Sequence, residues 1–173
     1  MFTLVTGAAA SGKSEFAESL IIQDPNPKRF YIATMELWDE ECQKRAQKHQ
    51  RNRGDKGFTT LECPRALHTL TFLPQSAVLL ECLSNLTANE CFGPQGFSDV
   101  EQRILQGIAH IRQQAQNLVV VSNEVFSDGI LYPSSTQRYL HCLAALNRVL
   151  AEQADSVIEV VAGLPIYWKG AKK

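Results

Sequence analysis

The stretch Gly7-Ala8-Ala9-Ala10-Ser11-Gly12-Lys13-Ser14 lies between the short apolar run 2–6 and the helix-forming segment 13–22. Its spacing is G-x-x-x-x-G-K-[ST], between an expected strand and an expected helix. In that setting, successive backbone N–H groups wrap around phosphate oxygens at the N-terminus of the helix. Lys13 would reach the terminal phosphates and the Ser14 hydroxyl would hold Mg²⁺. The stretch therefore predicts a nucleotide-binding P-loop rather than a glycine-rich turn without a function.

Outward from this loop, apolar runs alternate with helix-compatible segments along the chain. Strands are expected at 2–6, 29–34, 58–62, 77–82, 118–122 and 155–162, with one more short strand through Trp168. Helices are expected at 13–22, 39–53, 64–73 starting at Pro64, 99–116 capped by Asp99, and 135–153. Residues 84–98 and 123–133 are expected as loops, the first with a helical turn at most. Alternation of this kind predicts a single α/β domain over 1–173, with a mostly parallel sheet covered by helices on both faces.

The composition is that of an ordinary globular protein: 173 residues, 45% hydrophobic, 20% charged, and a net charge of -1. This balance excludes wholesale disorder and electrostatic capture of nucleic acid or anionic membrane. No apolar run approaches the ~20 residues of a membrane span, and the N-terminus lacks the pattern of a signal peptide. We therefore expect a cytoplasmic protein without a membrane span and without a nucleic-acid partner.

The cysteines and histidines show no spacing typical of metal ligands. They are Cys42, Cys63, Cys82, Cys91 and Cys142, and His49, His68, His110 and His141. Reduced thiols and no structural metal are the expectation.

Two carboxylates follow apolar strands and are candidates to organise magnesium or water. Glu81 comes after Ala-Val-Leu-Leu, and Glu124 comes after Val-Val-Val-Ser-Asn. Ligands of open α/β sheets bind beyond the carboxyl ends of the strands, where both residues would lie. The alternative is that each carboxylate simply ends a strand in solvent.

The segment 43–53 is rich in basic and amide side chains and has no apolar stripe. Arg45, His49 and Arg53 recur at every fourth position and share one face of the expected helix. Cations beside an imidazole favour its neutral, nucleophilic form and attract phosphate. On spacing alone, a solvated basic face is the simpler interpretation, and the absence of interleaved aromatic residues argues against a nucleic-acid patch.

An ordered set of motifs extends from the P-loop to the end of the chain. After the P-loop come Tyr31-Ile-Ala-Thr34, Arg45-x-x-x-His49, Thr60-x-Glu62, Leu79-Leu-Glu81-Cys, Val121-Ser-Asn-Glu-Val125, Leu150-Ala-x-x-Ala-Asp155 and Val161-Ala-Gly-Leu-Pro165. In this order the chain resembles the bifunctional adenosylcobinamide kinase / adenosylcobinamide-phosphate guanylyltransferase family of cobalamin biosynthesis. The resemblance covers nearly the whole sequence.

The resemblance implies a RecA-like P-loop fold, a homotrimer, and an enzyme with two activities. A nucleoside triphosphate (GTP or ATP) with Mg²⁺, held by Lys13 and the rest of the P-loop, would phosphorylate adenosylcobinamide. His49 would then attack the α-phosphate of GTP, and the GMP would pass to adenosylcobinamide phosphate to give adenosylcobinamide-GDP. Glu81 could accept hydrogen bonds from the guanine N1–H and amine groups. Beyond the P-loop, the nucleotide contacts implied are Thr34, Met35, Glu36, Gln50, Arg51, Asn52, Arg53, Glu62 and Glu81.

Some positions depart from the family pattern. Ala8 and Ala10 stand where the family usually has a glycine and an arginine, and Phe126 stands where it has a glycine. Leu140 and His141 replace an Arg-Asp pair. These departures indicate a divergent member, with the kinase step the more affected. Two alternatives are a generic P-loop kinase for another small molecule and a non-catalytic protein that binds GTP or a corrinoid.

Overall fold

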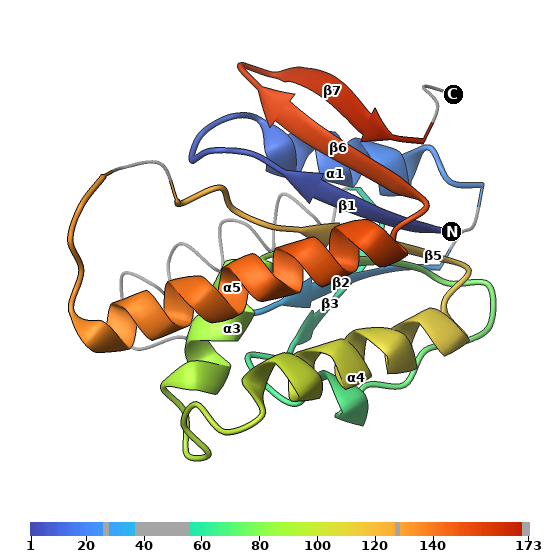
Figure 1. Ribbon diagram of the computed structural model, residues 1–173. Coiled ribbons are helices and arrows are strands. Elements are labelled where there is room, and N and C mark those ends of the chain that lie inside the picture. Colours follow the sequence, from blue (N-terminus) through green and yellow to red (C-terminus); the bar gives the residue numbers. More distant parts are fainter. Residues whose placement is uncertain (26–27, 37–55, 127–128, 171–173) are drawn as a thin grey trace.

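The computed structural model describes residues 1–25, 28–36, 56–126 and 129–170, and these ranges contain a seven-stranded sheet (Figure 1). The strand order is β3-β2-β4-β5-β1-β6-β7. The strands are β1 (Phe2–Thr6), β2 (Arg29–Ala33), β3 (Phe58–Glu62), β4 (Ala77–Leu80), β5 (Asn117–Val121), β6 (Ser156–Val161) and β7 (Leu164–Lys169). Neighbouring strands are parallel except β6 and β7, which are antiparallel. The predicted mostly parallel sheet is confirmed.

Helices cover both faces of this sheet. Helix α1 (Lys13–Ile22) packs on one face, and α3 (Leu83–Cys91), α4 (Val100–Gln114) and α5 (Ser134–Gln153) pack on the other (Figure 1). Strand β5 lies between β1, which leads into the phosphate loop, and β4, which leads to Glu81. The predicted α/β P-loop fold, with helices on both faces of the sheet, is therefore confirmed. The expected helix at 39–53 lies outside the described residues.

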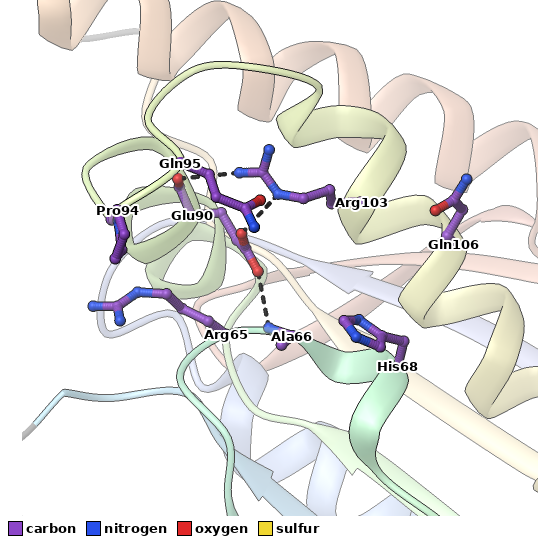
Figure 2. A pocket seen from close by; sticks show the side chains of 9 residues that line it. Arg65, Ala66, His68, Glu90, Pro94, Gln95, Arg103 and Gln106 are labelled. Carbon is purple, nitrogen blue, oxygen red and sulfur yellow. Dashed lines mark hydrogen bonds and ion pairs between the residues drawn. The ribbon is translucent and has the colours of Figure 1, made fainter.

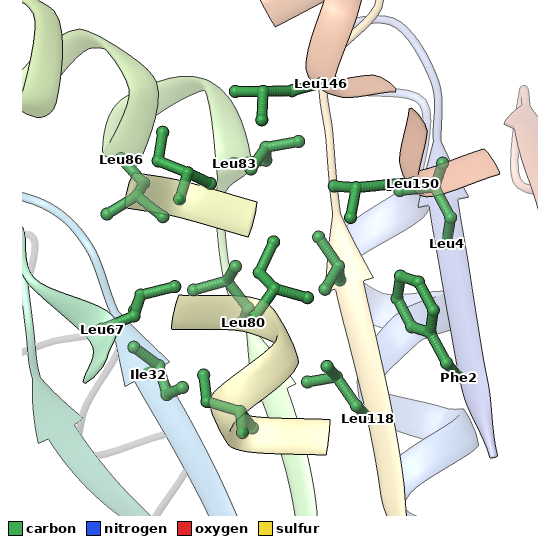
Figure 3. Close-up of a cluster of buried hydrophobic side chains, with 14 of the residues drawn as sticks. Phe2, Leu4, Ile32, Leu67, Leu80, Leu83, Leu86, Leu118, Leu146 and Leu150 are labelled. Carbon is green, nitrogen blue, oxygen red and sulfur yellow. The ribbon is translucent and has the colours of Figure 1, made fainter. Parts of the chain in front are cut away.

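Alternate residues of each central strand pack on opposite faces, which is why these strands read as continuous apolar runs. In β4, Leu80 packs with α3, α4 and α5, whereas Leu79 packs on the face of α1. The core on the α3–α5 face is built largely from leucine and isoleucine side chains (Figure 3).

The last two strands form a hairpin with a two-residue turn. Ala162 and Gly163 have φ of 49° and 80°, and Val161 pairs with Leu164 across the turn. Two successive left-handed residues match the right-handed twist of the flanking strands. The expected short strand through Trp168 is present as β7, and its Leu164, Ile166 and Trp168 side chains are exposed.

The expected helix at 64–73 is wrong: the structure has a single 3₁₀ turn, η1 (Leu67–Thr69). Ala66 has a left-handed φ of 56°, and its N–H donates to Glu90 Oε1 at 2.9 Å, so a helix cannot propagate from Pro64. Further along, the Phe72 N–H donates to Gln114 Oε1 at 2.8 Å.

The expected loop at 84–98 is also wrong in its first half, which forms α3. Asn85, Thr87 and Asn89 are weak helix formers, but Leu83 and Leu86 are completely buried and hold the helix against the core. Tertiary burial outweighs the local propensity here.

Helix α4 buries the expected face of Val100, Ile104, Ile108 and Ile111. The predicted capping by Asp99 is wrong, because its side chain makes no capping hydrogen bond. The residue has φ of 50°, and its Oδ2 accepts from Ser98 Oγ at 2.9 Å instead.

Candidate functional site

The phosphate-loop sequence connects β1 to α1 as the motif requires. Gly12 precedes the helix with φ of 87°, and its carbonyl accepts the Phe16 N–H at 3.0 Å. A Cβ on Gly7 would lie 2.6 Å from the Val160 carbonyl oxygen, so the loop can pass this point only with glycine. The loop thus presents its backbone at a helix N-terminus, where anions bind.

The turn of the β6–β7 hairpin supports the loop from the side. The Gly163 N–H donates to the Ser11 carbonyl oxygen at 2.8 Å. A Cβ on Gly12 would lie 3.3 Å from Gly163 Cα, so loop and turn are in close contact. The Val161-Ala-Gly-Leu-Pro165 motif therefore holds the shape of the phosphate loop.

Lys13 lies largely inside the loop, with 8% of its surface exposed. Its Nζ donates to the Ala8 carbonyl oxygen at 3.0 Å. Burial lowers the pKa of Lys13, while nearby Cys82 and Glu15 act in the opposite direction. A partly desolvated ammonium group gains from a phosphate partner, whereas exposed Ser14, at the first turn of α1, is accessible to a hydrated cation.

The other candidates described by the structure lie at the carboxyl edge of the sheet. The Glu81 N–H donates to the Ile32 carbonyl at 3.1 Å, and the Glu124 N–H donates to the Gly7 carbonyl at 3.0 Å. Glu62 is exposed at the end of edge strand β3. Glu81 and Glu124 therefore lie at the same edge of the sheet as the phosphate loop, and the backbone of Glu124 contacts the loop directly.

Thr34 and Glu36 already have partners in the fold. Thr34 is completely buried, and its hydroxyl donates to the Cys82 carbonyl at 3.1 Å. Glu36 forms an ion pair with Arg65. Met35 lies between them, half-buried. His49, Gln50, Arg51, Asn52 and Arg53 lie outside the described residues, so the structure does not test the expected nucleophile or its neighbours.

Sequence reasoning missed a polar cluster between β4 and β5, formed by Cys82, Ser84 and Asn123. Asn123 Nδ2 donates to Ser84 Oγ at 2.6 Å and to Cys82 Sγ at 3.6 Å. Ser84 Oγ and Cys82 Sγ are 3.0 Å apart. The signal that singled out Glu124, a polar residue after an apolar strand, applies equally to Asn123.

A cavity of about 410 Å³ lies elsewhere, between η1, the end of α3 and α4 (Figure 2). Glu90 accepts from Arg103 Nε at 3.0 Å and from the Ala66 N–H at 2.9 Å. Arg65, on the cavity wall, forms an ion pair with Glu36. No phosphate-loop residue lines this cavity, and its buried polar groups bond to one another.

Two further searches of the described residues bear on cofactors and membranes. Among residues 1–25, 28–36, 56–126 and 129–170, no three His, Cys, Asp or Glu side chains gather closely enough to hold a metal ion. In the same ranges, no helix has the length and apolar character needed to cross a bilayer.

Comparison with known proteins gives matches along nearly the whole chain. Residues 3–167 match the family described as cobinamide kinase / cobinamide phosphate guanyltransferase. The bifunctional adenosylcobalamin biosynthesis protein CobU of Salmonella typhimurium (strain LT2) is 36% identical over 96% of this chain and 98% of its own length. The CobU of Escherichia coli (strain K12) is 32% identical, with the same coverage. The CobP of Pseudomonas aeruginosa is 30% identical, over 98% of each chain.

Among solved structures, PH0250 from Pyrococcus horikoshii OT3 superposes with a TM-score of 0.50 at 10% identity, covering 99% of this chain and 87% of that one. That likeness concerns the fold alone.

Proposed function

This chain belongs to the cobinamide kinase / cobinamide phosphate guanyltransferase family, and we propose that it catalyses both reactions in cobalamin biosynthesis. It would phosphorylate adenosylcobinamide and then convert the product to adenosylcobinamide-GDP. The match over residues 3–167 carries this proposal, because it spans the phosphate loop, the sheet edge and the closing hairpin. We further propose that both reactions use one domain spanning 1–173.

For the kinase step, the substrate would be GTP or ATP with its phosphates on the backbone of residues 7–14. Lys13 would exchange its hydrogen bond to the Ala8 carbonyl for the terminal phosphates. Ser14, together with Glu81 or Glu124, offers the oxygen donors that Mg²⁺ prefers, and the ion would neutralise phosphate charge. The partly desolvated Lys13 ammonium supports this assignment.

For the second step, we propose His49 as the nucleophile. A ring nitrogen attacks the α-phosphorus of GTP, and the bond to the bridging oxygen of the β-phosphate breaks, releasing diphosphate. An oxygen of adenosylcobinamide phosphate then attacks the same phosphorus, and the phosphorus–nitrogen bond breaks to free His49. Glu81 and Glu62, at the ends of β4 and β3 on either side of β2, are proposed as guanine contacts. We also propose a homotrimer acting in the cytoplasm.

The test is the intact mass of the protein after incubation with GTP and Mg²⁺. We expect an acid-labile GMP adduct on the wild type and none on His49→Ala, while His68→Ala serves as a matched histidine control. An unmodified wild type that binds GTP would contradict the transfer step. Phosphorylation of a small molecule without an adduct would favour a generic P-loop kinase, and tight GTP binding without turnover would favour a non-catalytic sensor.

The same preparation tests the proposed assembly by analytical ultracentrifugation. A single trimeric species is expected, and a monomer at all concentrations would contradict it.

A further inference from the structure

Asn123 occupies a central position at the carboxyl edge of the sheet. It is the second residue after β5, and β5 lies between β1, which leads into the phosphate loop, and β4, which leads to Glu81. The next residue, Glu124, donates its N–H to the Gly7 carbonyl at 3.0 Å. Asn123 is therefore one residue from a direct contact with the start of the phosphate loop.

The amide group of Asn123 is held in one orientation. Its Nδ2 donates to Ser84 Oγ at 2.6 Å and to Cys82 Sγ at 3.6 Å. The preceding Ser122 hydroxyl donates to Asn147 Oδ1 at 2.6 Å and ties the end of β5 to α5. Within the described part of the chain, Asn123 Oδ1 accepts no hydrogen bond, and the half-buried side chain remains accessible.

The cluster of Cys82, Ser84 and Asn123 lies near Lys13 of the phosphate loop. Cys82, which contacts Asn123, is close enough to Lys13 to act on it electrostatically. Lys13 in turn donates to the loop carbonyl of Ala8. Cys82 is therefore close both to the amide of Asn123 and to the ammonium of Lys13.

We propose that Asn123 Oδ1 accepts a hydrogen bond from the hydroxyl of the phosphoryl acceptor and holds that hydroxyl against the terminal phosphate. The inference rests on the proposed kinase function. The hydrogen bond from Nδ2 to Ser84 fixes which way the amide faces, and its Oδ1 can only accept. Such a group attracts a hydroxyl and repels phosphate oxygens, so it selects the acceptor alcohol rather than the nucleotide.

In the step that Asn123 would position, the acceptor oxygen forms a bond to the γ-phosphorus. The bond between that phosphorus and the β–γ bridging oxygen breaks, and its electron pair leaves with the nucleoside diphosphate. The hydroxyl proton passes to a carboxylate, Glu81 or Glu124, and then to solvent. Asn123 takes no proton, and its contribution is orientation.

The experiment compares Asn123→Ala and Asn123→Asp with Gln95→Ala, which removes an exposed amide that lines the separate cavity between η1 and α4. Each variant is assayed for phosphorylation of cobinamide and, without acceptor, for self-guanylylation by GTP. Misplacing the acceptor costs on the order of 10²-fold in rate. We expect Asn123→Ala to lose about this much kinase kcat while nucleotide KM and self-guanylylation stay within twofold of wild type.

Asn123→Asp keeps an acceptor oxygen and can still bond to Ser84, so its kinase kcat should exceed that of Asn123→Ala by about tenfold. Its thermal midpoint, measured beside that of Asn123→Ala, separates a folding defect from a kinetic one.

Three outcomes would overturn the proposal. One is a kinase rate of Asn123→Ala equal to that of Gln95→Ala. The second is an equal loss of phosphorylation and self-guanylylation in folded Asn123→Ala, which would indicate a nucleotide contact. The third is an Asn123→Asp variant slower than Asn123→Ala, which would indicate that the amide donates to phosphate. A wild type without kinase activity would instead contradict the proposed function.

Discussion

The two faces of the sheet bury different numbers of hydrophobic side chains. Within the described residues, the face of α1 packs a smaller set of side chains, in which alanine and valine lie beside Tyr31, Phe58 and Leu79. The opposite face, under α3, α4 and α5, packs a larger set dominated by leucine and isoleucine (Figure 3). Helix α1, which covers the face with fewer buried side chains, begins with Lys13, a buried cation inside the phosphate loop.

This difference separates stability from phosphate binding. The hydrophobic effect scales with the apolar area buried, so among the described residues the α3–α5 face contributes more of the driving force for folding. The face of α1 can therefore accommodate a glycine-rich loop and a desolvated lysine, both of which cost stability. Core substitutions on the α3–α5 face should therefore cost more stability than those on the α1 face, whereas substitutions in the phosphate loop should affect nucleotide binding.

The largest effect is expected for Lys13→Met, which keeps an apolar stem and removes the charge. Loss of one preorganised group on a developing phosphate charge costs about 10²–10³-fold in rate. We expect that loss for nucleotide-dependent turnover and no decrease in the thermal midpoint, measured by circular dichroism. A fall of the midpoint comparable to that of a core substitution would contradict the separation of the two faces.

The next effect compares Leu79→Ala with Leu80→Ala, neighbours on opposite faces of β4. Both side chains are almost completely buried, at 1% and 0% exposure. Leucine-to-alanine changes in cores cost about 2–5 kcal/mol. We expect a loss of about 4 kcal/mol for Leu80→Ala and about 3 kcal/mol for Leu79→Ala. The α1 face has fewer buried side chains and can relax more fully around the space that the substitution leaves. Urea unfolding measures both, and an equal or reversed order would contradict the comparison.

A smaller effect concerns pH. Because burial lowers the pKa of Lys13, the unfolded chain binds more protons at this residue between the folded-state pKa and 10.5. The contribution of Lys13 to stability therefore rises with pH through that window. Nucleotide binding favours the charged lysine, so the affinity should fall as pH rises, by at most about tenfold per pH unit. Titration calorimetry with GTP checks this, and Lys13→Met should lack the dependence.

The smallest effect is expected for Ala10→Gly in the phosphate loop. Ala10 has a left-handed φ of 56°, which costs an alanine about 1–2 kcal/mol relative to glycine. Glycine also gains freedom in the unfolded chain, worth about 0.4–1 kcal/mol in the opposite direction. A net stabilisation of up to about 1.6 kcal/mol should appear in urea unfolding. Destabilisation would show that the Ala10 methyl group packs usefully.

Local patterns predicted the strands and the phosphate loop, because an apolar run before a glycine-rich turn leaves few alternatives. They failed where distant residues decide the local structure. Leu83 and Leu86 bury α3 despite its asparagines, and Glu90 captures the Ala66 N–H and prevents the expected helix. Neither contact can be read from neighbouring residues.

The candidate site divides in the same way. The motif located the phosphate loop, and its polar neighbours Glu81 and Glu124 followed from strand ends. The cluster of Asn123 with Ser84 forms because β4 and β5 are adjacent. Local sequence patterns do not give the strand order, so they could not predict this contact. The hydrogen bond from Gly163 to Ser11 likewise depends on β6 lying next to β1.

That bond has a consequence for how the protein is made. The Ser11 carbonyl lies near the start of the chain and receives its partner from Gly163, in the closing hairpin. A chain still emerging from the ribosome carries the phosphate-loop residues long before it carries the turn that braces them. The phosphate loop therefore gains this support only once the β6–β7 hairpin has been made.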